Sequence, residues 1–323
     1  MRRCFRFLTK LVCCAAVSAL AMMSAANAQE YPVKPIHVFV GPGPDILARI
    51  VGEKLGETLG QAVVVELRPA AGGIVAADTV VKAAPDGHTL LLSTGSYTIN
   101  SVLQPRLPYD FARDLTPITL MATLPFVLVV HPAVPAGGLK DLVAMARAKP
   151  GGLNYASSGN GTPPHLAGEL LKQLANINVV HVPYKGAAPA VTDVAGGQVQ
   201  MMFVPAPAAL PLIRSGKLRA IAVSSPQRYR GLPEVPTVAE QGFPDFAIVG
   251  WNGLHAPART PSAVIDRLNR EVARIMRLRE VQERAFAAGF ESVGSSIAEF
   301  DVFQKQDIAR AGNIIKAGNV QPD

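Results

Sequence analysis

The stretch from Asn154 to Leu174 contains residue types that can bind an anion through backbone and hydroxyl groups. A predicted short strand, Leu153–Ala156, leads into a loop of Ser, Gly, Asn and Thr, and a predicted amphipathic helix follows the loop directly. Glycines allow the loop to turn tightly and expose N–H groups, while the helix directs its partly positive N-terminus at the same point. The residues expected to bind a carboxylate here are Ser157, Ser158, Gly159, Gly161 and Thr162. The alternative is a polar turn whose Thr or Ser only caps the helix.

Three other polar loops follow predicted strands, at 41–45, 94–100 and 183–186. From Tyr31 onward the chain alternates strand-like and helix-like segments, which predicts an α/β fold with mostly parallel sheets flanked by helices. In such sheets ligands bind beyond the carboxyl ends of the strands. We therefore expect all four loops to face one common cleft.

Two apolar segments, Phe126–Val130 and Phe246–Leu254, are interpreted as crossing between two lobes. Lobe 1 is then expected to contain residues 29–127 and 251–323, and lobe 2 residues 128–250. The other predicted strands are Pro35–Val40, Ala62–Glu66, His88–Ser93, Val179–Val182, Val199–Val204 and Leu218–Val223. The predicted helices include Ile46–Leu59, Gly72–Ala83, Leu139–Ala148, Ala187–Ala195 and a helical tail from Pro261 onward.

The sequence has none of the common catalytic signatures, such as HExxH, GxSxG, SxxK, a Walker A motif or GxGxxG. Six histidines are scattered singly, and none lies at metal-ligand spacing from another histidine or a carboxylate. His165 differs from the others because it falls in the first turn of the helix behind the anion-binding loop, where it either lines the cleft or packs as a structural residue. We expect no catalytic residue, no metal and no cofactor.

Residues 1–28 have the form of an export signal. Four basic residues in the first ten precede an apolar run, Leu11–Ala26, and a small-residue cleavage site that ends at Ala28. All three cysteines, Cys4, Cys13 and Cys14, lie in this segment, so cleavage after Ala28 leaves no residue for a disulfide or a cysteine metal site.

Composition favours a packed globular protein outside the cytoplasm. Hydrophobic residues make up 49% of the chain and charged residues 17%, which argues against disorder. Removal of the signal lowers the net charge from +7 to about +3 and leaves no basic stripe with interleaved aromatics, so nucleic acid is not an expected partner. No later apolar run is long enough to span a bilayer, and the periplasm is the expected location if the source is a Gram-negative bacterium.

A series of motifs along the mature chain resembles the Bug family. In order they are YP-x-KPI, LG-Q-x-VVVE-x-RP-x-AGG, APDG-x-TLLL, LPYD, KPG-x-LNYAS-x-GNGT-x-x-HLAGEL, VHVPYKG, GGQVQMMF, GKLRAIAV and PEVPT-x-AE-x-G. Bug proteins are the periplasmic substrate-binding proteins of tripartite tricarboxylate transporters, and the resemblance runs from about Tyr31 to near Asp323. It implies a two-lobed, type II-like periplasmic-binding-protein fold that closes on a small organic anion. It also implies delivery to one large and one small integral membrane subunit.

The resemblance implies ligand-binding residues in both lobes. In lobe 2 it points to the loop already described and to His165. The lobe 1 residues that it implies are Thr94, Gly95, Ser96, Tyr97 and Asn100. The first loop of the family also contacts ligand, and its counterpart here is Gly41, Pro42 and Gly43.

Two departures from the family pattern are expected to shape the site. Only GPGP separates Val40 from Asp45, so the first loop is several residues shorter than the family form VPFPPGG-x-x-D. In addition, GGQVQMMF, which ends at Phe203, is commonly followed by a polar Asp or Asn, whereas this chain has Val204 and Pro205 there. We expect these three residues to form an apolar wall that suits a flat or aromatic acid better than citrate or an amino acid.

The sequence therefore predicts a monomeric, non-enzymatic solute-binding protein for a small carboxylate, with a preference for an aromatic acid. Two alternatives remain open at this point. One is a sensor component that presents ligand to a membrane kinase, which the absence of neighbouring transporter genes would favour. The other is a secreted α/β enzyme acting on carboxylic acids, which a nucleophile–base pair in the cleft would favour.

Overall fold

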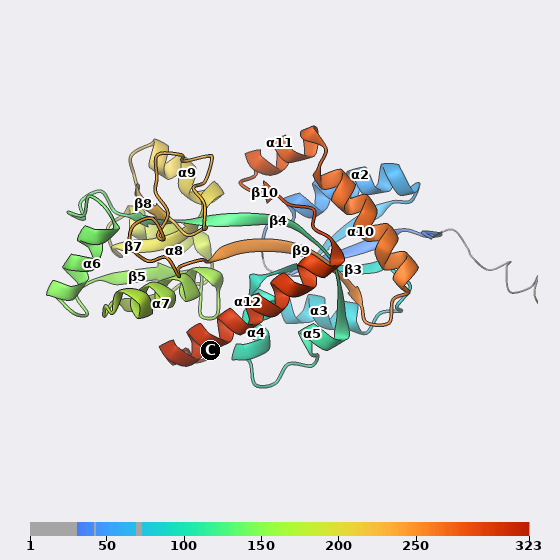
Figure 1. Ribbon diagram of the computed structural model, residues 1–323, viewed down its shortest axis with the longest axis horizontal. Coiled ribbons are helices and arrows are strands. Elements are labelled where there is room, and N and C mark those ends of the chain that lie inside the picture. Colours follow the sequence, from blue (N-terminus) through green and yellow to red (C-terminus); the bar gives the residue numbers. More distant parts are fainter. Residues whose placement is uncertain (1–30, 42, 69–72, 323) are drawn as a thin grey trace, which may run out of the picture.

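The computed structural model describes residues 31–41, 43–68 and 73–322 and forms two lobes joined by long strands (Figure 1). The predicted export signal and Pro42 lie outside the described residues. In the part of the chain that is described, helices long and apolar enough to cross a bilayer are not found.

In the first lobe the strands β1, β2 and β3 pair in parallel, with β1 in the middle. Their bounds are Ile36–Val40, Val63–Leu67 and Thr89–Thr94. The helices of this lobe are α2 (Ile46–Leu59), α3 (Ile74–Val81), α4 (Gly95–Leu103), α5 (Phe111–Asp114), α10 (Ser262–Met276) and α11 (Arg279–Ala287). Helix α2 has the predicted bounds and ends at Gly60, which adopts the left-handed conformation expected of a C-terminal glycine.

In the second lobe β5 pairs in parallel with both β6 and β7. The strands are β5 (Asn154–Ser157), β6 (Val180–Pro183), β7 (Met201–Pro205) and β8 (Arg219–Val223). The helices are α6 (Leu139–Ala148), α7 (Pro163–Ala175), α8 (Ala187–Ala195) and α9 (Ala206–Arg214).

Strands β4 (Leu115–Val130) and β9 (Val249–Pro257) run side by side between the lobes (Figure 1). They pair antiparallel along most of their length, and every other antiparallel pairing among the described strands involves one of them. The short β10 (Glu291–Ser292) also pairs with β4. The α/β architecture is thus confirmed, with parallel strands inside each lobe and an antiparallel pair joining the lobes.

Both faces of β4 are covered in the second lobe. Phe126, Leu128 and Val130 belong to one buried cluster, and Val127 and Val129 belong to another on the opposite face. This explains the unbroken apolar run, because a strand buried on both faces has no polar alternation. Full burial of each such side chain contributes about 1.5–3 kcal/mol, so the crossing strand is firmly held in place.

The segment Thr94–Asn100, predicted to be a polar loop, is mostly helical. Helix α4 begins at Gly95, with Thr94 in an extended conformation immediately before it. The prediction of a loop was wrong because the helix buries Tyr97 in the cluster that contains Trp251, and Ile99 and Leu103 in the cluster that contains Phe126. Only the junction between β3 and α4 remains free to meet a ligand.

The last helix, α12 (Ile297–Gly318), extends from the first lobe onto the second (Figure 1). Near its start, Phe300 packs with Trp251 in a cluster of the first lobe. Near its end, Ala311 and Ile314 join the second-lobe cluster that contains Phe126. The lobes are therefore linked by a helix as well as by β4 and β9.

A buried histidine should make stability depend on pH. His255 is fully buried, with its Nε2 2.6 Å from Gln304 Oε1 and its Nδ1 2.8 Å from Ser93 Oγ. Burial lowers the pKa of His255 to about 4, below its ordinary value of 6.5. Between these values the unfolded chain binds a proton that the folded chain does not, so acidification favours unfolding.

We expect the free energy of unfolding to fall by about 3 kcal/mol through His255 alone as the pH drops from 6.5 to 4. Denaturant titrations across this range would measure the loss. His255→Asn should start less stable yet lose less on acidification, whereas His131→Asn, a change at a partly exposed histidine, should follow the wild type. An equally steep loss in His255→Asn would contradict the assignment.

Candidate functional site

A cavity of about 330 Å³ lies between the lobes, at the carboxyl ends of strands from both. The first lobe contributes Thr94, Gly95 and Ser96 at the start of α4, and the second contributes Ser158 and Thr162 before α7. The crossing strands supply Leu124, Phe126, Trp251 and Asn252. The remaining lining residues are Gly43, Pro44, Pro163, Pro164, Gly186, Ala187, Pro205, Gly250 and Phe290.

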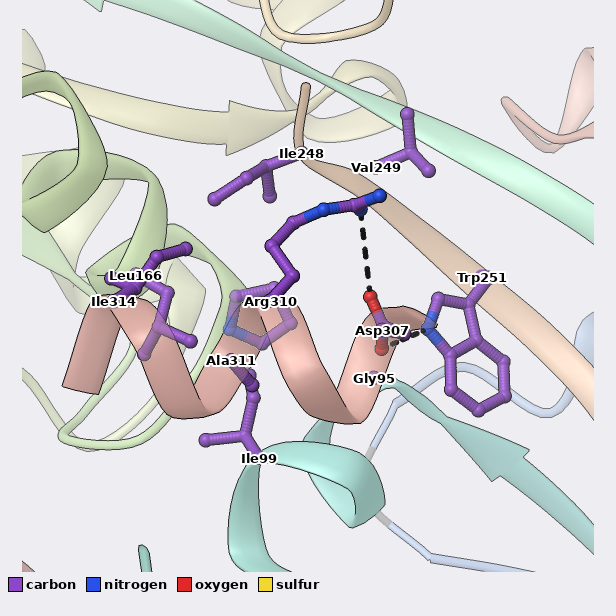
Figure 2. Close-up of a pocket in the computed structure, with 11 residues that line it drawn as sticks. Gly95, Ile99, Leu166, Ile248, Val249, Trp251, Asp307, Arg310, Ala311 and Ile314 are labelled. Carbon is purple, nitrogen blue, oxygen red and sulfur yellow. Dashed lines mark hydrogen bonds and ion pairs between the residues drawn. The ribbon is translucent and has the colours of Figure 1, made fainter. Parts of the chain in front are cut away.

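Two other hollows between the lobes are less suited to an anion. A gap of about 20 Å³ behind Trp251 (Figure 2) is large enough only for a water molecule. A wider groove of about 550 Å³ contains Arg228 and Arg230, but these are already paired with Glu240 and Glu291. The 330 Å³ cavity is the one in which several helices begin.

Helices α2, α4, α7, α8 and α9 all begin at this cavity or within two residues of it. A helix N-terminus carries unpaired N–H groups and roughly half a positive charge, although α7 offers fewer donors because its first two residues, Pro163 and Pro164, have no N–H. Among the described residues, none of the side chains that line the cavity is charged. The positive field in the cavity therefore comes from backbone dipoles, which suits a carboxylate or another small anion.

The loop before α7 is held by its own hydrogen bonds. Thr162 Oγ1 donates to the carbonyl of Gly159 at 2.7 Å, and the N–H of Gly161 donates to Nδ1 of His165 at 3.2 Å. The N–H of Gly186 donates to the carbonyl of Ser158 at 3.2 Å, which ties the start of α8 to the same loop. Ser158 and Thr162 are thereby positioned at the cavity.

Position 161 requires a residue without a side chain for two reasons. Its φ is +65°, in the left-handed region that favours glycine. A Cβ at this position would also lie 2.6 Å from Cδ2 of Leu103 on α4, across the lobe boundary. The glycine supports the loop without lining the cavity.

His165 and His181 form a stacked pair next to this loop. Their ring centroids are 3.8 Å apart and the planes differ by 7°. His181 Nε2 lies 2.7 Å from Ser157 Oγ. Burial, with smaller contributions from the charges of His165 and Lys172, lowers the pKa of His181 to about 3 and keeps this imidazole neutral near pH 7.

The Ser157–His181 contact resembles a nucleophile–base pair but does not face the cavity. Ser157 is fully buried, and its hydroxyl also lies 3.1 Å from both the N–H and the carbonyl of Gly159. A ligand in the cavity would meet Ser158 instead. The pair orders the loop and gives no support to catalysis.

Seven of the sixteen predicted site residues that the structure describes meet at the cavity. Those that line it are Gly43, Thr94, Gly95, Ser96, Ser158, Thr162 and Pro205. Those that the structure places behind the lining are Gly41, Tyr97, Asn100, Ser157, Gly159, Gly161, His165, Phe203 and Val204.

The side chains of Tyr97, Phe203 and Val204 point into the core, each at most 1% exposed. Tyr97 is stacked on Phe111 at 5.7 Å, and its hydroxyl approaches Gly41 so closely that a Cβ there would collide. Phe203 is stacked on Phe246 at 5.5 Å. These residues support the loops, and the predicted apolar wall therefore retains only Pro205.

Other apolar residues, which were not predicted to bind ligand, replace that wall. Leu124 and Phe126 lie two apart on β4 and share a face, so a period-two reading of this strand would have found them. Gly250 lies opposite Leu124 in β9 and leaves room beside Phe126. Phe290 follows α11 in the helical tail, and nothing in its local sequence connects it with the loops.

Comparison with known proteins gives a consistent result. A family model described as the tripartite tricarboxylate transporter family receptor, TctC, matches residues 47–320. The chain is 34% identical to protein BugT of Bordetella pertussis over 306 residues, which cover 93% of this chain and 94% of BugT.

Solved structures of binding proteins are similar over nearly the whole chain. R. palustris Rpa4515 with adipate is 31% identical with a TM-score of 0.81, covering 91% of this chain and 100% of its own. MatC from Rhodopseudomonas palustris with bound malate is 30% identical with a TM-score of 0.76, covering 88% and 100%.

We expect Gly161→Ala to destabilise the protein more than Gly216→Ala and to weaken ligand binding. Both positions have left-handed φ values, +65° and +69°, so each substitution costs about 1 kcal/mol of backbone strain. Only Gly161 has a neighbour, Leu103, within 4 Å on the opposite lobe, whereas the space around Gly216 is open. Thermal unfolding and isothermal titration would compare the two, and equal behaviour would contradict the role given to Gly161.

Proposed function

The chain belongs to the tripartite tricarboxylate transporter receptor family, and on that basis we propose that it captures a small organic carboxylate outside the cytoplasm and delivers it to membrane subunits. The observation that carries the proposal is the convergence of five helix N-termini, from both lobes, on one cavity with no charged side chain in its described lining. Its family and its structural relatives are solute-binding proteins, and we propose no catalytic role.

The polar side of the cavity suits a carboxylate. The hydroxyl of Ser96 adds a donor to the N–H groups at the start of α4, and the hydroxyl of Ser158 supplies a donor near the start of α7, where Pro163 and Pro164 have no N–H. A carboxylate held by neutral donors avoids the desolvation of a second buried charge, which helps a carrier release its cargo. The adipate and malate bound to the related proteins support this ligand class.

The opposite side suits an apolar ligand body. Leu124, Phe126, Phe290 and Pro205 are not able to pair with a second charge. The preference for an aromatic or aliphatic acid, first inferred from Phe203, Val204 and Pro205, therefore rests on a different set of side chains.

We further propose that cleavage after Ala28 produces a monomeric periplasmic protein. Residues 29–127 and 251–323 would form lobe 1 and residues 128–250 lobe 2, with α12 of lobe 1 extending onto lobe 2. One large and one small membrane subunit would receive the ligand, in keeping with the family description.

Contacts across the lobes support closure on the ligand. The Arg230 guanidinium lies over the ring of Phe286 at 3.6 Å, and its Nε is 3.5 Å from Glu291. A Cβ at Gly289 would collide with Pro207 at the start of α9. Phe290, between these contacts, lines the cavity. Closure would thus bring Phe290 against the ligand.

The binding proposal is tested by adding one charge to the cavity. In Ala187→Asp a carboxylate would occupy the N-terminus of α8 where that helix meets the cavity, so we expect carboxylate affinity to fall more than tenfold. Ala188→Asp is the matched control, because it adds the same charge to the same turn at an exposed position outside the cavity.

The assay is isothermal titration of the chain from Gln29 with aliphatic, aromatic and amino-acid carboxylates. Binding by the wild type and Ala188→Asp, but not by Ala187→Asp, is the expected result. No binding by any folded protein, or equal binding by all three, would refute the proposal.

The contacts that Arg230 makes across the lobes predict that substitutions of Arg230 and Arg228 will differ in their effect on closure and binding. Arg230→Ala removes the contacts to Phe286 and Glu291, so we expect a larger radius of gyration without ligand and an affinity about fivefold lower. Arg228→Ala is the control, because Arg228 pairs with Glu240 of its own lobe. Small-angle X-ray scattering and titration would measure both, and identical results for the two variants would argue against closure through Arg230.

A further inference from the structure

A carboxylate lies at the junction of both lobes without lining the ligand cavity. Asp307, near the middle of α12, points toward β9 and the first turn of α4 (Figure 2). Its Oδ2 accepts hydrogen bonds from Thr98 Oγ1 at 2.6 Å and from Trp251 Nε1 at 3.0 Å. One carboxylate oxygen thus forms hydrogen bonds with α4 and with β9, and both of these elements line the cavity.

Trp251 is confined on three sides. Phe300 and Phe303 contact its ring edge-on, each with a centroid distance of 5.8 Å, and Asp307 accepts its only polar hydrogen. The indole is 2% exposed and lines both the ligand cavity and the small gap behind it. Its orientation therefore determines part of the cavity wall.

The first turn of α4 is held by the same carboxylate. Thr98 Oγ1 has one hydrogen, and it lies 2.6 Å from Asp307 and 2.8 Å from the carbonyl of Gly95. The charged acceptor is the closer one and forms the stronger bond. A Cβ at Gly95 would lie 3.3 Å from Trp251 Nε1 and 3.4 Å from Cγ of Pro163, so the starts of α4 and α7 meet at the indole.

The charge of Asp307 does not itself favour an anionic ligand. Burial raises the pKa of Asp307, and the nearest cation, Arg310 Nη1, is 3.8 Å from Oδ1. A negative group close to an anion-binding cavity repels the ligand. Asp307 is therefore better explained as the hydrogen-bond acceptor of Thr98 and Trp251 than as a charge that acts on the ligand.

We propose that Asp307 is a positioning residue of the ligand site, which fixes the indole of Trp251 and the first turn of α4 in the arrangement that lines the cavity. This inference rests on the proposed function for its effect on binding, but its effect on Trp251 is independent of any ligand. Because α12 also packs on the second lobe, where Gln173 Nε2 donates to the carbonyl of Ile314 at 3.0 Å, Asp307 sets these elements relative to both lobes.

The test compares two substitutions of Asp307. Asp307→Leu removes the acceptor, whereas Asp307→Asn keeps one carbonyl oxygen, which is sufficient because both donors meet the same oxygen. Trp251 is the only tryptophan in the chain, so its fluorescence reports this site alone. The matched control is Asp301→Leu, on the same helix, where the side chain pairs with Lys305 and is partly exposed to solvent.

In Asp307→Leu we expect lower Trp251 anisotropy without ligand and carboxylate affinity reduced about tenfold. Asp307→Asn and Asp301→Leu should retain the wild-type anisotropy and bind within about threefold of wild type. Wild-type anisotropy and affinity in Asp307→Leu would overturn the proposal, as would equal loss in Asp307→Asn.

If Asp307→Leu does not fold, Thr98→Val serves as the second variant, because it removes one donor and keeps the side-chain shape. It should weaken binding severalfold with unchanged Trp251 anisotropy, and wild-type affinity would count against the positioning role. If the wild type itself binds no carboxylate, the proposed function fails, while the anisotropy of Asp307→Leu still decides whether Asp307 holds Trp251.

Discussion

The antiparallel pairing of β4 and β9 determines how the rest of the site is arranged. β4 runs through both lobes and β9 pairs with its first-lobe half, so the parallel strands on either side end at a common cavity. Helices that start from those strand ends direct their N-termini inward. The same strands also supply the apolar floor through Leu124 and Phe126, because alternate residues of a strand share a face. The pairing of β4 with β9 thus determines where both the polar side and the apolar side of the cavity lie.

Some of the architecture could be predicted from the sequence because it depends on local patterns. Helices α2, α6 and α8 have the predicted bounds, since their apolar periodicity and flanking glycines are visible in a short window. Helix α4 was missed because its first turn contains Gly, Ser and Thr, which are typical of loops, and its β-branched residues have low helix propensity.

The directions of the side chains within the site could not be predicted from local sequence patterns. Tyr97 belongs to a predicted loop yet turns into the core, because the helix that replaces the loop sets its direction. Phe203 and Val204 lie on opposite faces of β7, and helices cover both faces. Phe290 reaches the cavity from the end of the chain, and only tertiary contacts bring it there.

The division of helix N-termini between the lobes bears on how tightly a ligand is held. The strand ends of the first lobe present α2 and α4, and those of the second present α7, α8 and α9. An anion in an open cleft would interact with one group and with water, whereas the closed cavity places it near both groups with less water to screen them. Under the proposed closure, the ligand would stabilise the closed form by the difference between its binding free energies to the closed and open forms. In that proposal, contacts such as Arg230 with Phe286 would need only to be weak, because a strong interaction would close the lobes without ligand.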